Sequence, residues 1–195
     1  SRIVMTLGRE VSTKGSTFTI RRFRDEPFTP VDLLEFKTFS SMQIAFFWLA
    51  MQYGMSMLFV GGTASGKTTS LNACSLFLPW QHKIVSIEET RELNLPHPNW
   101  IPGCTRQGFG GESGGSGQKA AGEVDMYDLL RAALRERPEY IIVGEIRGAE
   151  AYVLFQAMAT GHTTYSTFHA DSIQSLVHRL ENKPIEIPRV LIPAL

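Results

Sequence analysis

The chain has 195 residues, 43% of them apolar, and its 19 Lys and Arg residues balance its 19 Asp and Glu residues. This composition fits one ordinary globular domain with a buried core and excludes an intrinsically disordered chain. Zero net charge also argues against a protein whose main task is to coat nucleic acid or an anionic membrane, because both tasks need surplus positive charge. The charge is not evenly distributed along the chain, since residues 1–24 carry six basic side chains and a single acidic one.

The two cysteines, Cys74 and Cys104, are too few and too isolated for a disulfide framework or a CxxC metal site, which indicates a reducing, cytosolic compartment. No charged residue occurs between Lys37 and Lys67, but polar residues and Gly54 interrupt this stretch, so it does not predict a membrane span. The chain starts without Met and stops in apolar residues, which predicts a piece of a longer protein.

Residues 1–24 are expected to form the C-terminal edge of an N-terminal domain. Within them, residues 3–7 and 18–23 have the pattern of two strands joined by a turn. Residues 25–29 include a proline and are predicted to be a linker. Residues 30–195 are predicted to form the main domain, incomplete at its C-terminal end.

Two helices are predicted at the start of the main domain. Thr29 is a typical N-cap and Pro30 a typical first residue for a helix that reaches residue 36. Ser40 and Gln43 form a capping box for a second helix, which ends near residue 52. Apolar residues of this second helix form two stripes, one of Met42, Ala45, Phe46, Leu49 and Tyr53, the other of Ile44, Phe47, Trp48 and Met51. Burial on two sides is therefore expected, either in one larger core or with one side in a subunit interface.

Strand and helix patterns alternate through the rest of the chain. Strands are predicted at residues 55–60, 84–87, 140–143 and 163–168, and helices at 67–77, 126–135, 149–160 and 172–180. This alternation is typical of an α/β domain with a largely parallel sheet. The run Ile141, Ile142, Val143 is apolar throughout, which favours a central strand covered on both faces. Residues 108–122 are predicted to be a Gly-rich loop that is too polar to pack.

A phosphate-binding loop is the most specific motif. Residues 61–68, GGTASGKT, fit the pattern GxxxxGK[ST] and lie between a predicted strand and a predicted helix. Backbone N–H groups of such a loop turn toward an anion, and the helix N-terminus adds positive potential. Lys67 is expected to reach the β- and γ-phosphates, and the Thr68 hydroxyl is expected to ligate magnesium. The predicted nucleotide-binding residues are Gly62, Thr63, Ala64, Ser65, Gly66, Lys67, Thr68 and Thr69.

Acidic side chains follow two of the predicted strands. Glu145 follows the strand at 140–143, at the end that borders the ligand crevice in an open parallel sheet. It is the candidate for orienting magnesium through water, and the alternative is an ion pair with a neighbouring Arg. Glu88, Glu89 and Glu92 follow the strand at 84–87 and can polarise water or hold metal. Their alternative interpretation is a solvated run of charges.

Two histidines flank the last predicted strand. His169 follows its carboxyl end and can hydrogen-bond a γ-phosphate or an acidic partner, although its spacing is equally compatible with a structural role. His162 follows Gly161, a predicted helix C-cap, and is interpreted as structural. Their odd spacing places them on opposite faces of a regular strand, so a shared metal is not expected.

Four motifs in order resemble the motor ATPases of type II secretion, type IV pilus and type IV secretion systems. They are the phosphate loop GGTASGKT, the acidic box IEETRE, the strand end IIVGEIRG as an atypical Walker B motif, and the histidine box TGHTTYSTFHA. The stretch MYDLLRAALRERPEYIIVGEIRG, with FTIRRFRDEPFTPVDLL upstream, is most similar to the archaeal branch that drives the archaellum or archaeal type IV pili. Glu89 and Thr90 replace the Asp and Pro that bacterial relatives usually have, which fits that branch.

The resemblance implies a RecA-like P-loop ATPase domain, preceded by the last strands of an N-terminal domain. It implies ATP and Mg²⁺ as cofactors and a homohexamer at the cytoplasmic face of the cell membrane. An inner-membrane platform protein is the implied partner for assembling or rotating a filament. Arg2 and Arg21 match basic positions of the family's N-terminal domain that contact nucleotide phosphates, where an arginine can stabilise developing charge.

The resemblance also ranks the acidic and histidine candidates. Glu92 matches the last acidic residue of the box and is the preferred catalytic base, with Glu88 supporting it. Glu145 matches the Walker B glutamate, and His169 matches the histidine that faces the γ-phosphate.

Two other functions are compatible with the sequence. RecA-like hexamers also translocate nucleic acid, but aromatic residues interleaved with a positive groove, which single-strand binding usually needs, are missing, so no nucleic-acid partner is expected. The other alternative is a nucleotide-gated scaffold that binds ATP without useful turnover, and the full set of acidic candidates argues against it.

Overall fold

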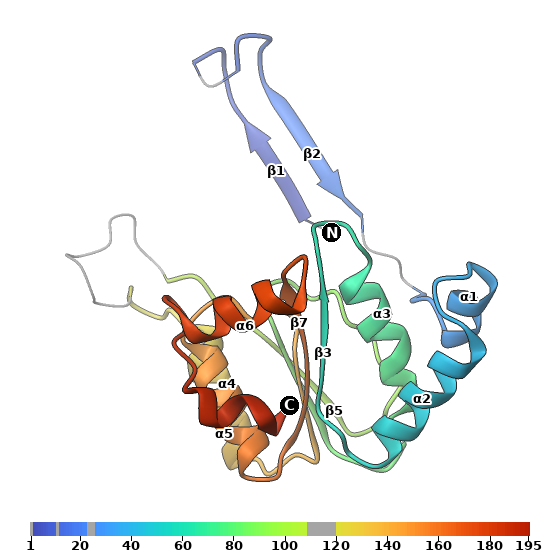
Figure 1. Cartoon of the computed structure of the whole chain (residues 1–195). Coiled ribbons are helices and arrows are strands. Elements are labelled where there is room, and N and C mark those ends of the chain that lie inside the picture. Colours follow the sequence, from blue (N-terminus) through green and yellow to red (C-terminus); the bar gives the residue numbers. More distant parts are fainter. Residues whose placement is uncertain (1, 11, 23–25, 109–119) are drawn as a thin grey trace.

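The computed structural model describes residues 2–10, 12–22, 26–108 and 120–195. Of Arg2 and Arg21 it describes the backbone alone. The described part of the chain consists of an N-terminal β-hairpin and an α/β domain (Figure 1). Most of the Gly-rich loop predicted at residues 108–122 lies outside the described residues.

The hairpin consists of β1 (Arg2–Thr6) and β2 (Thr17–Arg21), which pair antiparallel. It projects away from the domain (Figure 1). Apolar side chains of both strands are exposed, among them Ile3, Val4, Met5, Phe18 and Ile20. The two strands predicted at the start of the chain are therefore confirmed, whereas their assignment to an N-terminal domain stays a prediction.

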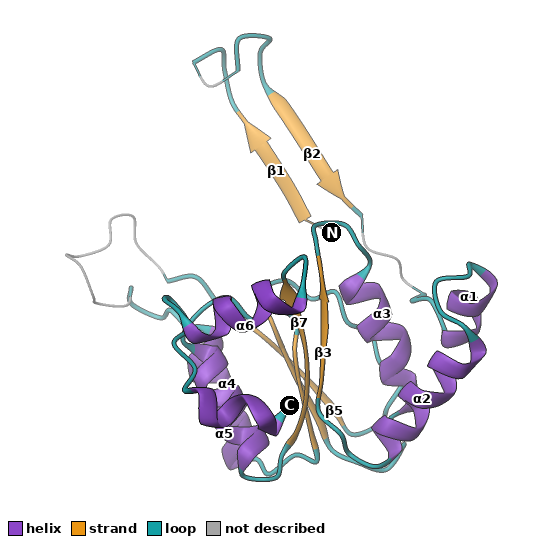
Figure 2. Cartoon of the chain, viewed as in Figure 1, coloured by secondary structure: helices purple, strands orange, loops and turns teal. Residues whose placement is uncertain are grey.

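A five-stranded parallel sheet forms the centre of the domain (Figure 2). The strand order is β3-β7-β6-β4-β5, and all four neighbouring pairs are parallel. The strands are β3 (Met57–Gly61), β4 (Ile84–Glu88), β5 (Trp100–Cys104), β6 (Tyr140–Val143) and β7 (Thr163–His169). β6 is central and every one of its residues is buried, as its apolar run predicts. The α/β fold with a largely parallel sheet is confirmed.

The sequence pattern does not predict β5. This strand contains Pro102 and Gly103, two residue types that disfavour a strand interior. Its position explains why they are tolerated, because among the described strands β5 lies at the edge of the sheet and pairs with β4 alone. Trp100 also anchors the strand, donating from Nε1 to Ser86 Oγ at 2.9 Å.

Helices cover both faces of the sheet (Figure 1). One side carries α1 (Pro30–Glu35), α2 (Ser41–Gln52), α3 (Lys67–Cys74) and the 3₁₀ helix η1 (Ser75–Phe77). The other side carries α4 (Met126–Arg135), α5 (Glu150–Ala159), α6 (Ile173–Glu181) and η2 (Arg189–Ala194). Two apolar cores result, one around Leu71 and Tyr165, the other around Leu130 and Leu154.

Helix starts follow the signals in the sequence. Thr29 is the N-cap of α1 as predicted, in a capping box with Asp32, and Ser40 forms the predicted capping box of α2. Asp125 forms a third box with Asp128 at the start of α4. Gly161 follows α5 with φ +94°, as expected of a residue that ends a helix. The helix predicted at 67–77 is α-helical only through Cys74 and ends as η1.

Within the described residues, α2 is buried on one side and exposed on the other. Ile44 and Met51 of one stripe are buried, but the opposite stripe is 58–82% exposed at Met42, Phe46, Leu49 and Tyr53. No element among the described residues covers that side, so the predicted burial on two sides, in one larger core or in a subunit interface, stays a prediction. Among the described residues, no helix is both long enough and apolar enough to cross a bilayer.

Candidate active site

The loop between β3 and α3 has the shape of an anion cradle. A Cβ atom on Gly61 would lie 2.6 Å from Ser65 Oγ, so the tight approach of these two residues requires glycine. Gly66 adopts φ +87° and is the N-cap of α3, which has no side-chain cap. The first-turn N–H groups of α3 are therefore available to an anion.

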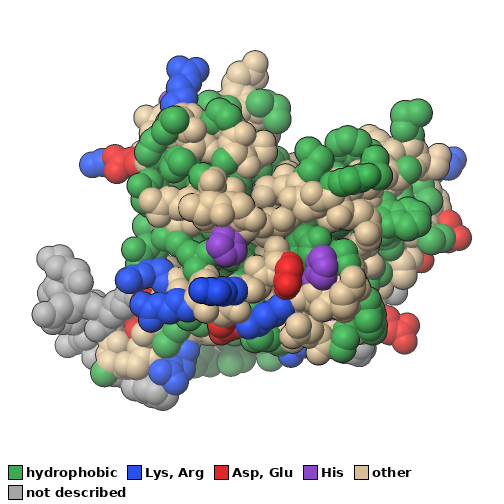
Figure 3. Space-filling view, turned by 90° about the horizontal axis from the view of Figure 1, so that it is seen from below, with side chains coloured by type: hydrophobic (Ala, Val, Ile, Leu, Met, Phe, Trp, Pro, Cys, Tyr) green, Lys and Arg blue, Asp and Glu red, His purple; other side chains and the backbone are tan. Residues whose placement is uncertain are grey.

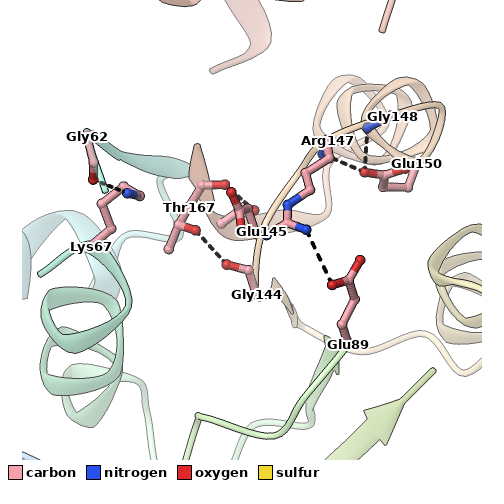
Figure 4. A network of polar contacts seen from close by, with 10 residues as sticks. Gly62, Lys67, Glu89, Gly144, Glu145, Arg147, Gly148, Glu150 and Thr167 are labelled. Carbon is pink, nitrogen blue, oxygen red and sulfur yellow. Dashed lines mark hydrogen bonds and ion pairs between the residues drawn. The ribbon is translucent and has the colours of Figure 1, made fainter. Parts of the chain in front are cut away.

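Lys67 opens α3 and lies against its own loop. Its Nζ donates to the Gly62 carbonyl oxygen at 2.5 Å (Figure 4). Ser65 Oγ donates to the same oxygen at 2.9 Å. A backbone carbonyl is a weaker partner for an ammonium group than a phosphate oxygen is. Lys67 is therefore placed to exchange this contact for one with a bound phosphate.

Glu88, at the end of β4, is buried with 2% of its surface exposed. Its Oε1 accepts hydrogen bonds from the backbone N–H groups of Glu92 at 2.9 Å and Leu93 at 3.0 Å. Burial raises the pKa of the Glu88 carboxyl, and these two N–H donors oppose that shift. Oε2 has no hydrogen-bond partner among the described residues. The neighbouring strand end packs closely against Glu88, because a Cβ on Gly144 would lie only 3.2 Å from Glu88 Cγ.

Glu92 is positioned by the loop that Glu88 organises. The Glu92 N–H donates to Glu88. Two residues further on, the Asn94 N–H donates to Asn72 Oδ1 of α3 at 3.2 Å. Asn72 is buried and lines the same cavity as Glu92. The acidic loop is thus fixed to the helix that starts at the phosphate loop.

Glu145 follows β6 and forms an ion pair. Its Oε2 lies 2.6 Å from Arg147 Nη2, and Arg147 Nη1 lies 3.5 Å from Glu89 Oε2 (Figure 4). The hydrogen bond with Glu145 raises the pKa of the Arg147 guanidinium further above its ordinary value. The alternative given for Glu145, a pair with a neighbouring Arg, is therefore present, and it leaves the carboxylate at the cavity wall.

β7 contributes the last group of side chains. Thr167 Oγ1 donates to the Gly144 carbonyl oxygen at 2.7 Å, which joins the ends of β7 and β6. His169 ends the strand and lines the cavity, and Arg179 of α6 donates to the His169 carbonyl oxygen while its guanidinium covers the Phe168 ring. Arg179 itself also lines the cavity.

These groups surround one cavity of about 800 Å³ at the carboxyl ends of β3, β4, β6 and β7. The residues predicted from the sequence that line it are Thr63, Ala64, Ser65, Gly66, Lys67, Thr68, Thr69, Glu88, Glu89, Glu92, Glu145 and His169. Gly62 belongs to the same loop and accepts from Lys67. The side chains of Arg2 and Arg21 lie outside the described residues, so their contact with phosphate stays a prediction.

Among the cavity residues that sequence reasoning missed are the polar side chains of Asn72, Arg147, Thr167 and Arg179. Arg147 lies two residues after Glu145, so the Walker B motif itself carried a signal for it. Nothing in the sequence signals Arg179, which reaches the cavity because α6 folds back over the end of β7.

The cavity fits a nucleoside triphosphate with magnesium. The Thr68 hydroxyl and the Glu145 carboxylate offer the hard oxygen donors that Mg²⁺ prefers. No group of three or more His, Cys, Asp and Glu among the described residues is arranged to hold a metal by itself. Mg²⁺ at nucleotide sites uses one or two protein ligands together with phosphate and water, so the donor set suits a metal that arrives with its substrate.

Residues 6–189 match the family model described as Type II/IV secretion system protein. The chain belongs to this family. An uncharacterized protein of Methanocaldococcus jannaschii is 49% identical over 166 residues, which cover 85% of this chain and 58% of that relative. The type IV secretion system protein PtlH of Bordetella pertussis is 41% identical over 140 residues, 69% of this chain and 38% of PtlH. The chain therefore spans 58% or less of the length of these two family members.

Solved structures of the secretion family have the same fold. The VirB11 ATPase from the Brucella suis type IV secretion system, in complex with sulphate, matches with a TM-score of 0.62 and 28% identity over 91% of this chain and 52% of that chain. The pilus retraction motor PilT with bound ADP matches with a TM-score of 0.56 and 21% identity, covering 92% of this chain and 50% of that one. The predicted RecA-like P-loop fold and the resemblance to secretion and pilus ATPases are confirmed.

A second, shallow hollow lies at the opposite end of the sheet, where the strands begin. Among its lining residues are His82, Arg137, Glu139 and His162. Figure 3 views the molecule from this end and shows histidine side chains near Lys and Arg side chains. His162 precedes β7 and His169 ends it, so the two histidines lie at opposite ends of this strand.

Proposed function

We propose that this chain is the ATPase domain of a secretion or pilus motor, which binds ATP with Mg²⁺ and hydrolyses it. One observation carries the proposal: the phosphate loop, the acidic loop after β4, Glu145 and His169 line a single cavity at the carboxyl ends of parallel strands. That edge of an open α/β sheet is the usual place for a ligand. The sulphate complex of VirB11 and the ADP complex of PilT support it, because both are relatives of this fold that bind anions or nucleotide.

Each side chain has a proposed role in the reaction. Lys67 leaves the Gly62 carbonyl to bind the β- and γ-phosphates, and His169 donates to the γ-phosphate. Glu92 accepts the proton of the attacking water, and Glu88 positions the Glu92 backbone through the bond to its N–H. Thr68 and Glu145 would hold Mg²⁺, Glu145 through water, and the bound ion would neutralise phosphate charge as it develops.

The assembly we propose is a homohexamer at the cytoplasmic face of the cell membrane, acting on an inner-membrane platform protein. PtlH and PilT, named for type IV secretion and pilus retraction, support a filament or secretion machine. The sequence motifs favour the archaeal branch that drives an archaellum or a type IV pilus. The exposed stripe of α2 and the exposed hairpin supply apolar surface for contacts between subunits, and Arg2 and Arg21 of the hairpin would reach the nucleotide there. Nucleic acid is not an expected partner.

Steady-state ATP hydrolysis by the complete protein tests the catalytic part of the proposal. Lys67→Ala should abolish turnover and leave the fold intact, whereas Lys183→Ala, which removes an exposed lysine outside the cavity, should leave turnover unchanged. Omitting Mg²⁺ should also stop hydrolysis. Normal turnover of the Lys67→Ala protein would refute the assignment.

Glu92→Gln separates binding from chemistry. The variant should bind ATP as the parent does but hydrolyse it much more slowly, because an amide cannot accept the proton of the attacking water. An unaffected rate would move the role of base to Glu88.

Specific activity at increasing protein concentration tests the assembly. A steep rise would show that subunits complete one another's sites, as the hexamer requires. Activity independent of concentration would indicate a self-contained monomer and would remove Arg2 and Arg21 from the site.

A further inference from the structure

Arg147 connects two carboxylates at the cavity wall. Its Nη2 lies 2.6 Å from Glu145 Oε2, a short charge-assisted hydrogen bond, and its Nη1 lies at the longer distance of 3.5 Å from Glu89 Oε2 (Figure 4). The two acceptors come from different strand ends, since Glu145 follows β6 and Glu89 follows β4. The guanidinium therefore has one close partner and a second acceptor within reach.

The backbone around Arg147 is fixed, so its side chain is the part that can move. Glu150 Oε1, in the first turn of α5, accepts from the N–H groups of Arg147 at 2.7 Å and Gly148 at 2.8 Å. One residue earlier, the Ile146 N–H donates to the Thr167 carbonyl oxygen at 3.1 Å. The Arg147 side chain is 60% exposed, which leaves it room to change partner.

A single carboxylate cannot serve Arg147 and the hydration shell of Mg²⁺ equally well. Glu145 Oε2 already accepts from Arg147, which makes this carboxylate a weaker acceptor for a magnesium-bound water, and the guanidinium and the metal ion repel each other. Glu89 is 50% exposed and negatively charged, so it can take over the guanidinium without burying an unpaired charge. The pair with Glu145 thus opposes the metal, and the contact with Glu89 offers an alternative.

We propose that Arg147 is a latch on Glu145, a regulatory inference that rests on the proposed function of this cavity. Without nucleotide, Arg147 pairs with Glu145 and keeps it from the metal. Arrival of the magnesium nucleotide turns Glu145 toward the ion, and Arg147 moves to Glu89. Arg147 is a positioning residue in this scheme, because it acts through Glu145.

The latch is tested by the Mg²⁺ concentration that gives half-maximal binding of a fluorescent, non-hydrolysable ATP analogue to the complete protein. Arg147→Gln should lower this midpoint about two- to fivefold, the range that corresponds to an exposed ion pair. Arg147→Lys keeps the positive charge but cannot reach two acceptors at once as a guanidinium does. Its Mg²⁺ midpoint should lie between those of the parent and of Arg147→Gln. Glu89→Gln should raise the midpoint, because the second acceptor of the guanidinium then carries no negative charge and holds it more weakly.

A matched control removes an arginine from an ion pair elsewhere. Arg189 Nε lies 3.3 Å from Glu181 Oε1, and neither residue lines the cavity, so Arg189→Gln should leave the midpoint unchanged. A second control measures Arg147→Gln in a protein that already carries Glu145→Gln. It distinguishes an effect of Arg147 through Glu145 from the loss of one positive charge near the cavity. In that background Arg147→Gln should have no further effect, because the latch acts only through Glu145.

The Mg²⁺ midpoints of these variants decide between the latch and its alternatives. An unchanged or higher midpoint for Arg147→Gln, or an equal fall in the Glu145→Gln background, would overturn the latch while the parent protein still binds the analogue with Mg²⁺. If the parent does not bind the analogue at any Mg²⁺ concentration, the proposed function fails and the latch fails with it.

Discussion

Replacing Glu88 by Ala should destabilise the folded chain by about 1–3 kcal/mol, since the buried Leu93 N–H loses its acceptor, whereas the partly buried Glu92 N–H can turn to water. Glu88 Oε1 accepts from the N–H groups of Glu92 and Leu93, and Leu93 is 1% exposed, so water cannot replace the carboxylate at Leu93 without opening the loop. A loss of this size is a large part of the stability of an ordinary domain, about 5–15 kcal/mol.

Glu88→Gln is the matched variant, because its amide oxygen can keep both hydrogen bonds. Burial raises the pKa of Glu88 above its ordinary value of 4.5, so the folded state binds a proton more tightly than the unfolded state does. The stability that this group contributes is present below about pH 4.5 and is lost as the pH rises through the raised pKa. The Glu88→Gln protein should therefore gain stability relative to the parent as the pH rises from 4.5 toward neutrality.

Urea unfolding followed by circular dichroism measures both effects, at several pH values for the parent and both variants. A loss below about 1 kcal/mol for Glu88→Ala would show that the Leu93 N–H does not depend on this carboxylate. A difference between parent and Glu88→Gln that grows in favour of the parent with rising pH would refute the raised pKa.

Three further predictions concern the scaffold, each measured by urea unfolding. Ile142→Ala should cost about 2–5 kcal/mol, because Ile142 is fully buried in the central strand, and a cost below 1 kcal/mol would contradict that packing. Asp125→Ala should cost about 1 kcal/mol by removing the cap of α4, and an unchanged stability would mean that the cap is not formed. Phe46→Ser should change stability by no more than about 0.5 kcal/mol, since Phe46 is 60% exposed, and a larger loss would mean that this face of α2 is covered.

The phosphate loop shows how much of the candidate site can be read from the sequence. Gly61, Gly66 and Lys67 act within a few residues of one another, so their spacing already contains the geometry of the cradle. The arrangement of the acidic residues can be predicted from the sequence only in part. The rule that parallel strands bring their carboxyl ends to one edge predicts that Glu88 and Glu145 are near each other, but not that Glu88 is buried with its Oε1 bonded to the loop backbone.

The sequence by itself determined most of the helices and strands, because their signals depend on residues close together in the chain. The capping box of Ser40, the glycines of the phosphate loop and the apolar run of β6 are such local signals. The tertiary structure alone decided the rest. β5 is a strand because β4 offers it an edge, Arg179 reaches the cavity because α6 folds back, and Arg147 selects Glu145 and Glu89 because β4 and β6 are neighbours. These contacts join segments far apart in the chain, so no pattern within one segment could specify them.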